Sequence, residues 1–309
     1  MPLIRIPFKG GFNKQITQSE AANQWTDGDF VRFRYGEPEK IGGWQQAVAT
    51  TLPGVARATH IWTDKDGTEY IAIGTSKGFI LFYGGGIYDI SPLETAITGL
   101  TFTSTNGSAT VTVNKTSHNL SAGEFVVFSS VTMPGSGTGF TAANFTDNPF
   151  QIITAATNSF TITMPSSESG SGMTAAGSGT VQSYFPVGSA TQTLGFGWGT
   201  GTWNGSTAWG SATAASATSL EPANWSLDNY GTILIATIKN GGTFEWNPTD
   251  GVTTRATAVT TNPTASVMTI VSDTDRHLVH LGTETTIGNI NTQDKMFIRF
   301  SDQEDRTDY

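Results

Sequence analysis

Residues 55–92 read VARATHIWTDKDGTEYIAIGTSKGFILFYGGGIYDISP, and this stretch decides the fold class. Apolar and polar residues alternate in four short segments, at about 56–63, 69–74, 78–83 and 87–90, with the period of two that half-buried strands show. The intervening DKDG, GTSKG and GGG supply the Asp and Gly residues that tight turns require. The segment is therefore predicted to form a four-stranded antiparallel meander, the size of one propeller blade.

Similar but less regular patterns return near the end of the chain. Residues 225–248 (WSLDNYGTILIATIKNGGTFEWNP) and 266–284 (SVMTIVSDTDRHLVHLGTE) alternate strand-like segments with polar turns, and KMFIRFSDQED begins another strand. Residues 95–185 differ, because they carry few charges and contain the strand candidates ATVTVN, EFVVFSS, FQIITAA and SFTITMP. A long insertion costs little loop entropy when its two ends lie close together. We therefore predict an all-β fold of propeller-like antiparallel meander blades with an inserted small β sandwich or barrel.

These patterns divide the chain into five predicted regions. They are an N-terminal arm and docking strand (1–54), a first propeller-like blade (55–94), the inserted small β domain (95–185), a Gly/Ser/Trp-rich ordered loop (186–220) and further propeller-like blades (221–309).

The Gly/Ser/Trp-rich loop is too apolar for a free linker and too rich in Gly for a regular strand. We expect its aromatic residues, which include Trp198 and Trp203, to hold it in place and to pack against a neighbouring subunit. A flexible loop is the alternative.

Composition narrows the possible functions. The 309 residues include no Cys, which excludes disulfides, thiolate metal sites and a Cys nucleophile. No apolar run is long enough for a membrane-spanning helix, and the first residues lack the apolar core of a secretory signal, so synthesis and folding in a cytoplasm are expected. The net charge of −9 disfavours tight binding of nucleic acid, whereas an acidic wall suits a channel through which DNA slides.

Three short motifs suggest chemistry but have simpler explanations. GTSKG matches the Gly-x-Ser-x-Gly pattern of a nucleophile elbow, yet a strand follows it where the elbow requires a helix, so a hairpin is expected. His277 and His280 are three residues apart, which places them on opposite faces of a strand. Asp64 and Asp66 lack the remaining ligands of a calcium loop and favour an Asx turn. We predict no enzymatic activity, no metal site and no cofactor.

Charged and aromatic residues concentrate in GDFVRFRYGEPEKIGGW, residues 28–44. Arg32 and Arg34 alternate with aromatic and apolar residues, which predicts a half-buried strand with one basic face. The acids that flank Pro38, Glu37 and Glu39, are expected to pair with these bases rather than to form a glycosidase carboxylate pair.

The end of this stretch is expected to leave the strand. Pro38 should end the strand pairing, and Gly42–Gly43 should turn the chain so that Trp44 anchors the arm on the first blade.

Two stretches of the chain resemble a known family. FVRFRYGEPEKIGGW and ANWSLDNYGTILIATIKNGGTFEWNP are similar to segments of tail proteins from short-tailed, double-stranded DNA bacteriophages, in which an RxxxGxPEKxGGW-like start precedes a first blade and a WSLDNxG…NGGxxxxW segment opens a later one. MFIRFSDQED also resembles a strand and loop of that family. The family is that of tail nozzle proteins, also called packaged-DNA stabilisation proteins. The resemblance does not cover residues 95–185.

The resemblance implies a virion protein of the phage tail. Nozzle subunits form a homo-oligomeric ring, a hexamer, below the head-to-tail adaptor on the portal side; the ring extends the DNA channel, retains packaged double-stranded DNA, allows its ejection, and offers sites for tail fibres or a needle. A full six-blade propeller with an insert needs more than 309 residues, so either other chains complete the propeller or the architecture is reduced.

The assembly interface is predicted to involve basic and aromatic residues of the arm and of the Gly-rich loop: Arg32, Arg34, Tyr35, Trp44, Trp198 and Trp203. Two alternatives stay open. The eight Trp residues are compatible with a carbohydrate-binding or depolymerising tail module, and an arm that clamps a neighbour is compatible with a head-to-tail adaptor or decoration protein.

Overall fold

The computed structural model describes residues 9–21, 23–43, 45–134, 138–146, 148–188 and 222–309. Trp44, Trp198 and Trp203 of the predicted interface lie outside the described residues. The chain divides into two compact units, residues 1–49 and residues 50–309.

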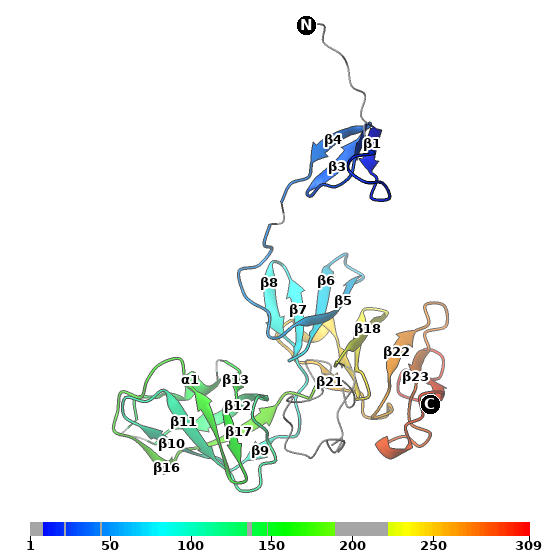
Figure 1. Cartoon of the computed structure of the whole chain (residues 1–309). Coiled ribbons are helices and arrows are strands. Elements are labelled where there is room, and N and C mark those ends of the chain that lie inside the picture. The colour runs from blue at the N-terminus through cyan, green and yellow to red at the C-terminus, as the bar shows by residue number, and fades with distance from the viewer. Residues whose placement is uncertain (1–8, 22, 44, 135–137, 147, 189–221) are drawn as a thin grey trace, which may run out of the picture. The chain divides into compact units, whose positions relative to one another are not determined.

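The N-terminal unit consists of two small pairs of strands. The parallel pair is β1 (Lys9–Phe12) with β2 (Gln24–Trp25), and the antiparallel pair is β3 (Val31–Arg34) with β4 (Glu37–Lys40) (Figure 1). Tyr35 and Gly36 join β3 to β4 with φ angles of 53° and 84°. Two successive positive φ values are those of the tight turn that matches the twist of a hairpin.

The expectation for Pro38 is wrong. Pro38 lies within β4, directly opposite Phe33, and the pairing continues to Lys40. Proline lacks an amide hydrogen but is tolerated in an edge strand, where that hydrogen is not needed for pairing, and β4 pairs with β3 alone.

The first sheet of the second unit confirms the meander predicted for residues 55–92. Its four antiparallel strands follow chain order: β5 (Ala56–Thr63), β6 (Glu69–Thr75), β7 (Phe79–Tyr83) and β8 (Gly86–Asp89). GTSKG is the β6–β7 hairpin, as predicted. The Asx turn is confirmed as well, because Asp64 Oδ1 accepts the amide hydrogens of Asp66 and Thr68, each at 2.9 Å.

Two further antiparallel sheets contain the later repeats. The second sheet holds β18 (Trp225–Tyr230), β19 (Ile233–Ile238), β20 (Thr243–Trp246) and β21 (Thr257–Ala258). The third sheet holds β22 (Met268–Val271), β23 (Leu278–Leu281) and β24 (Ile298–Phe300). Two 3-10 turns, η1 (Pro248–Asp250) and η2 (Ile290–Thr292), lie in their connections.

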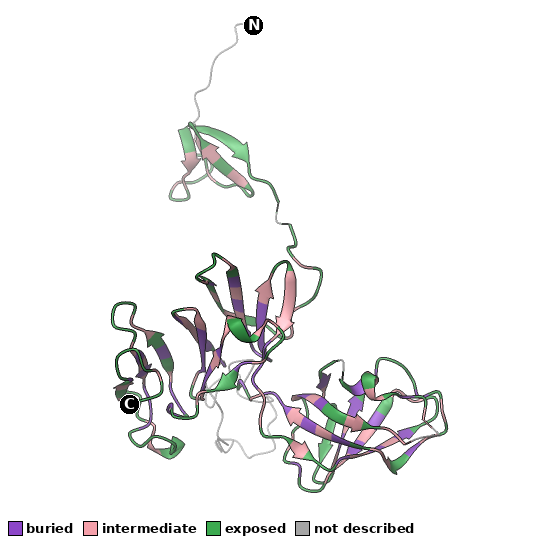
Figure 2. Ribbon diagram, turned by 180° about the vertical axis from the view of Figure 1, so that it is seen from behind, coloured by how far each residue is buried: buried purple, intermediate pink, exposed green. Residues whose placement is uncertain are grey.

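The segment between the first and second sheets is a β sandwich, as predicted. One sheet has the order β14 (Thr154–Ala156), β15 (Ser159–Thr163), β11 (Thr110–Asn114), β10 (Thr101–Thr105), β16 (Gly172–Ala176). The other has the order β13 (Phe150–Gln151), β12 (Phe125–Thr132), β17 (Ser178–Ser183), β9 (Ile97–Thr98). Its core contains many Phe side chains and is separate from that of the meander sheets. Figure 2 shows buried segments within its strands.

Two details of the sandwich differ from the sequence prediction. The short helix α1 (Ala142–Thr146), which the all-β prediction did not include, buries Phe145. FQIITAA is not one strand, because β13 and β14 belong to different sheets. Among the described residues, no helix is long and apolar enough to cross a membrane.

Candidate functional site

The first two meander sheets pack face to face through aromatic side chains. Trp62 of β5 stacks on Tyr70 of β6 at 5.2 Å between ring centroids, and Trp246 of β20 contacts both rings from the second sheet. Trp225 of β18 stacks on Phe79 of β7 at 4.9 Å. Aromatic pairs of this geometry add to the free energy gained by burial, so the two sheets share one core.

Gly74, the first residue of GTSKG, is required by this packing. A Cβ atom at Gly74 would lie 2.5 Å from the Trp225 ring, which is closer than any ordinary carbon contact. The indole N–H of Trp225 donates to the carbonyl oxygen of Thr75 at 2.8 Å. The motif therefore has a packing role.

The layer between the second and third sheets is largely polar. The hydroxyl of Thr237 in β19 lies 2.9 Å from that of Thr243 in β20 and 2.7 Å from that of Thr269 in β22. Ser226 of β18 donates to the Thr269 carbonyl at 2.6 Å. All three threonines are fully or almost fully buried and hydrogen-bonded, and a small apolar cluster of Tyr230, Ile235 and Leu278 joins them in holding the third sheet.

A buried histidine belongs to the same layer. His280 of β23 is fully buried, with Nδ1 3.0 Å from Ser266 Oγ and Nε2 2.8 Å from the phenol oxygen of Tyr309. Burial and, to a lesser extent, the positive charge of the nearby Arg299 guanidinium together lower the pKa of His280 from 6.5 to about 4. The imidazole is therefore neutral at pH 7, donating a hydrogen bond from one nitrogen and accepting with the other.

His280 should make the second unit sensitive to acid. Its pKa is lower in the folded state than in the unfolded state, so stability is full above the unfolded value of 6.5 and is lost as the pH falls toward 4. Between pH 7 and pH 5 we expect a loss of about 2 kcal/mol in the free energy of unfolding, measured by urea denaturation. His280→Gln should be less stable at pH 7 but should lose about 2 kcal/mol less on acidification; an identical pH dependence would contradict the assignment.

The outer face of the third sheet is apolar and exposed. Met268 and Ile270 of β22 and Ile298 and Phe300 of β24 are all large, exposed hydrophobic side chains. An antiparallel sheet with one solvated face ordinarily buries its apolar side and exposes its polar side. This sheet instead exposes a row of apolar side chains, which is typical of a surface that another polypeptide covers.

The outer face of the first sheet has the same character. Ile61 of β5 is 65% exposed and lies directly opposite Ile71 of β6, which lies opposite Phe82 of β7, which lies opposite Ile87 of β8. The last three side chains are only partly buried. The series of sheets thus has an apolar surface at each end.

Three residues of the predicted interface lie on the N-terminal hairpin. Arg32 Nε donates to Glu39 Oε2 at 3.0 Å across the β3–β4 pair, which confirms the predicted local ion pair. The Arg34 guanidinium carbon lies 5.5 Å from the centre of the Tyr35 ring, and Tyr35 is 94% exposed. The structure brings these three residues together, and their part in an interface stays a prediction.

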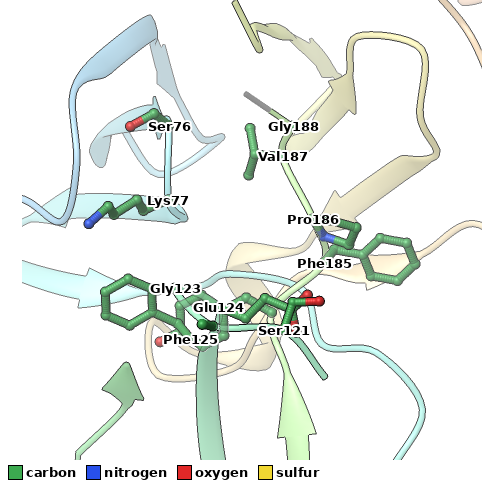
Figure 3. A pocket seen from close by; sticks show the side chains of 12 residues that line it. Ser76, Lys77, Ser121, Gly123, Glu124, Phe125, Phe185, Pro186, Val187 and Gly188 are labelled. Carbon is green, nitrogen blue, oxygen red and sulfur yellow. The ribbon is translucent and has the colours of Figure 1, made fainter. Parts of the chain in front are cut away.

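An open groove lies beside the sandwich (Figure 3). It has a volume of about 360 Å³ between the β6–β7 turn, the loop before β12 and the segment after β17. Lys77 lies 5.5 Å from the centre of the Phe125 ring, and Phe125 stacks on Tyr184 at 5.8 Å. A neighbouring cavity of about 490 Å³ shares Glu124 and Tyr184 with the groove and adds Glu94.

Two carboxyl groups lie in this region. Burial raises the pKa of Glu94, and the negative charge of Glu124 raises it further. A carboxyl group with a raised pKa near a second carboxyl group is a feature of acid–base chemistry on a glycosidic bond. The sequence prediction named neither residue, because they are 30 positions apart and precede different strands.

Next to the groove, a charged cluster holds the two ends of the insertion together. Asp89 at the end of β8 accepts hydrogen bonds from the Ser91 hydroxyl at 2.6 Å, from Arg255 Nη2 at 3.0 Å and from the Tyr184 phenol. Arg255 Nη1 also donates to the Ser91 carbonyl at 2.9 Å. Burial and the Asp89 charge raise the pKa of Tyr184, so its phenol stays protonated as a donor.

The fold and these surfaces define the class: an all-β protein whose face-to-face antiparallel sheets carry an inserted sandwich. No family model and no curated protein matches the chain. One similar solved structure is the endosialidase of phage phi92, with 13% sequence identity and a TM-score of 0.23. The alignment covers 88% of this chain and 41% of that chain. A likeness of this degree defines neither a shared fold nor a shared activity.

Proposed function

We propose that this chain is a structural subunit of a bacteriophage tail, and specifically of the nozzle that extends the DNA channel below the head-to-tail adaptor. The observation that supports this best is the pair of apolar outer faces on the first and third sheets, with Ile61 and Phe300 the most exposed members of their rows. A monomeric protein rarely exposes two such apolar surfaces, whereas an assembly subunit buries them against its neighbours. The resemblance of the stretches at 30–44 and 223–248 to nozzle proteins supports the proposal that this assembly is the tail nozzle.

In this proposal the subunits form a homo-oligomeric ring, a hexamer, in the virion tail. The ring contacts the adaptor on one side and tail fibres or a needle on the other, and DNA passes through it during ejection. The net charge of −9 suits that passage, because few phosphate contacts would retain the DNA.

Imaging of virions that carry a tagged copy of this chain tests the proposal. We expect about six copies at the single tail vertex, below the adaptor. Copies distributed over the head would favour a decoration protein, and virions that lack the chain would contradict a structural role.

The N-terminal hairpin supplies a contact that can be tested separately. Arg32→Ala combined with Arg34→Ala should reduce incorporation into particles at least about tenfold, because interfacial Arg residues often contribute more than 1.4 kcal/mol to binding. The N-terminal unit should stay folded, since both side chains are exposed. Incorporation is measured by quantitative blotting of purified particles. Lys40→Ala, at an exposed position of the same hairpin, is the matched control, and unchanged incorporation of the double variant would refute the role.

A second candidate function is carbohydrate binding or cleavage in the groove. The stacked Phe125 and Tyr184 rings, Lys77, and the carboxyl pair Glu94 and Glu124 support it. A glycan array of bacterial surface polysaccharides, followed by a digestion assay, tests it. Binding that Phe125→Ala removes, or cleavage that Glu94→Gln removes, would favour this function. If neither binding nor cleavage is detected, the groove has no such role, which would agree with the prediction that the chain is not an enzyme.

A further inference from the structure

We infer that the outer face of the third sheet binds the outer face of the first sheet of a second copy of this chain. The inference rests on the proposed function in one respect, that the chain acts as an assembly subunit. It adds which surfaces meet and in which order. Face A is the apolar side of β22–β24, and face B is the apolar side of β5–β8.

Face A consists of two cross-strand rows. The register places Met268 opposite Leu281 and Leu281 opposite Ile298. The second row runs in the same way, through three further apolar residues in direct register: Ile270, Val279 and Phe300. All six side chains are apolar, and the four on the outer strands β22 and β24 are 40–63% exposed.

Face B is built in the same way from the other end of the series. One row consists of Ile61, Ile71, Phe82 and Ile87, and Ile73 of the next row lies on the same side of the sheet. The one charged group in that next row is Asp89 of the edge strand, which is paired with Arg255 and accepts a hydrogen bond from the Tyr184 phenol. Both faces are therefore apolar surfaces that present no unpaired charge in these rows.

A second copy fits these faces better than a partner of another kind. A nucleic acid or an acidic or basic peptide would need unpaired charged groups, and the charged residue in these rows, Asp89, is already paired with Arg255. The chain itself offers two apolar faces of matching construction, and sheet-on-sheet packing is already how it builds its own core. Each copy can thus supply the surface that the other needs.

The order of the sheets favours pairing of A with B over pairing of like faces. Within the chain, the first sheet packs on the second and the second on the third, in chain order. A continuation of that order places the third sheet of one copy on the first sheet of the next. Such a head-to-tail contact leaves one free A and one free B at the ends of any open chain of subunits, so it repeats, and it closes into a ring when the rotation between copies brings the two free faces together.

Two charge variants at exposed positions test the pairing. Phe300→Asp disables face A, and Ile61→Asp disables face B. Wild-type protein should assemble with increasing concentration in analytical ultracentrifugation, and each variant alone should be monomeric, with a dissociation constant raised at least about tenfold. An equal mixture of the two variants should form a dimer and nothing larger, because one intact A and one intact B remain in each pair.

Ile153→Asp is the matched control, since Ile153 is an exposed isoleucine of the sandwich outside both faces. It should assemble as wild type does. Urea denaturation of every variant checks that the fold is kept.

The outcomes separate this inference from the proposed function. A wild-type chain that stays monomeric, or a mixture of variants that forms no dimer, would overturn the A–B contact. A chain found at the tail vertex but monomeric in solution would contradict the contact and leave the tail function standing. A chain that forms dimers through faces A and B but is absent from virions would support the contact and contradict the tail function.

Discussion

Trp225→Ala should lower the free energy of unfolding of the second unit by about 3–5 kcal/mol, the largest effect expected of a single core substitution here. Trp225 is almost fully buried, and its ring stacks on Phe79 at 4.9 Å. Its loss would open a cavity between the first two sheets and would leave the Thr75 carbonyl without the indole donor. Urea denaturation followed by circular dichroism measures the change.

Gly74→Ala damages the same contact from the opposite side. The added Cβ would lie 2.5 Å from the Trp225 ring, so the ring or the strand must shift, at a cost of about 1–3 kcal/mol. Met296→Ala is the control, because Met296 is 87% exposed and its truncation should change stability by less than about 0.5 kcal/mol. A Trp225→Ala protein as stable as this control would show that the two sheets do not share a core.

The sequence predicts the meander sheets well for a physical reason. In β5–β8 each strand has one face toward a core and the turns need Gly or Asp, so both the period of two and the turn residues are visible in the sequence. The N-terminal stretch shows the limit of the same reasoning. Arg32 and Phe33 follow the alternation, but the sequence around Pro38 does not show that its strand lies at the edge of a sheet, where proline is tolerated.

The sandwich was harder to predict because its elements depend on distant contacts. Helix α1 has five residues, too few to show a helical period, and it forms because Phe145 is buried against Phe102 and Phe128 of the sandwich. The split between β13 and β14 depends on which partner strand each segment meets, and that information lies elsewhere in the chain.

The candidate surfaces were only partly visible in the sequence. Arg32, Arg34 and Tyr35 stood out because charges and aromatics are adjacent there. Face A did not stand out, because the alternation in β22 and β24 shows two faces but not which one is outside. The structure decides this, since Thr269 is buried and Ile270 is not. Pairs such as Glu94 and Glu124 have no local signature at all.

Glu168 is the other position where a single substitution should have a large effect. Its buried carboxylate accepts hydrogen bonds from the Ser104 hydroxyl at 2.8 Å, the Thr138 hydroxyl at 2.9 Å, and the amides of Gly139 and Gly170. Burial alone would raise the pKa of Glu168, but these donors outweigh it and hold the pKa below its usual 4.5. The carboxylate thus joins β10 to the loop at 138–139 and to its own loop before β16.

Glu168→Ala should destabilise the sandwich by about 3–5 kcal/mol, because it leaves several buried donors without an acceptor. Glu168→Gln should recover about half of that loss, since its amide oxygen still accepts while its NH₂ group faces other donors. Hydrogen exchange measured by mass spectrometry should show the loss of protection in β10, β11 and β17, with β5–β8 protected as in wild type. Glu124→Ala, at a half-buried position of the same domain, should leave both regions unchanged.

The pH dependence gives this prediction a second readout. Because the pKa of Glu168 is lower in the folded than in the unfolded protein, its contribution is present above pH 4.5 and is lost as the pH falls through the lowered value. Wild-type sandwich protection should therefore decrease in that acid range, below the range in which His280 acts, and Glu168→Gln should remove the decrease. A Glu168→Ala protein with wild-type protection in β10 would show that the Ser104, Gly139 and Gly170 donors find other acceptors, and that the carboxylate does not hold the sandwich together.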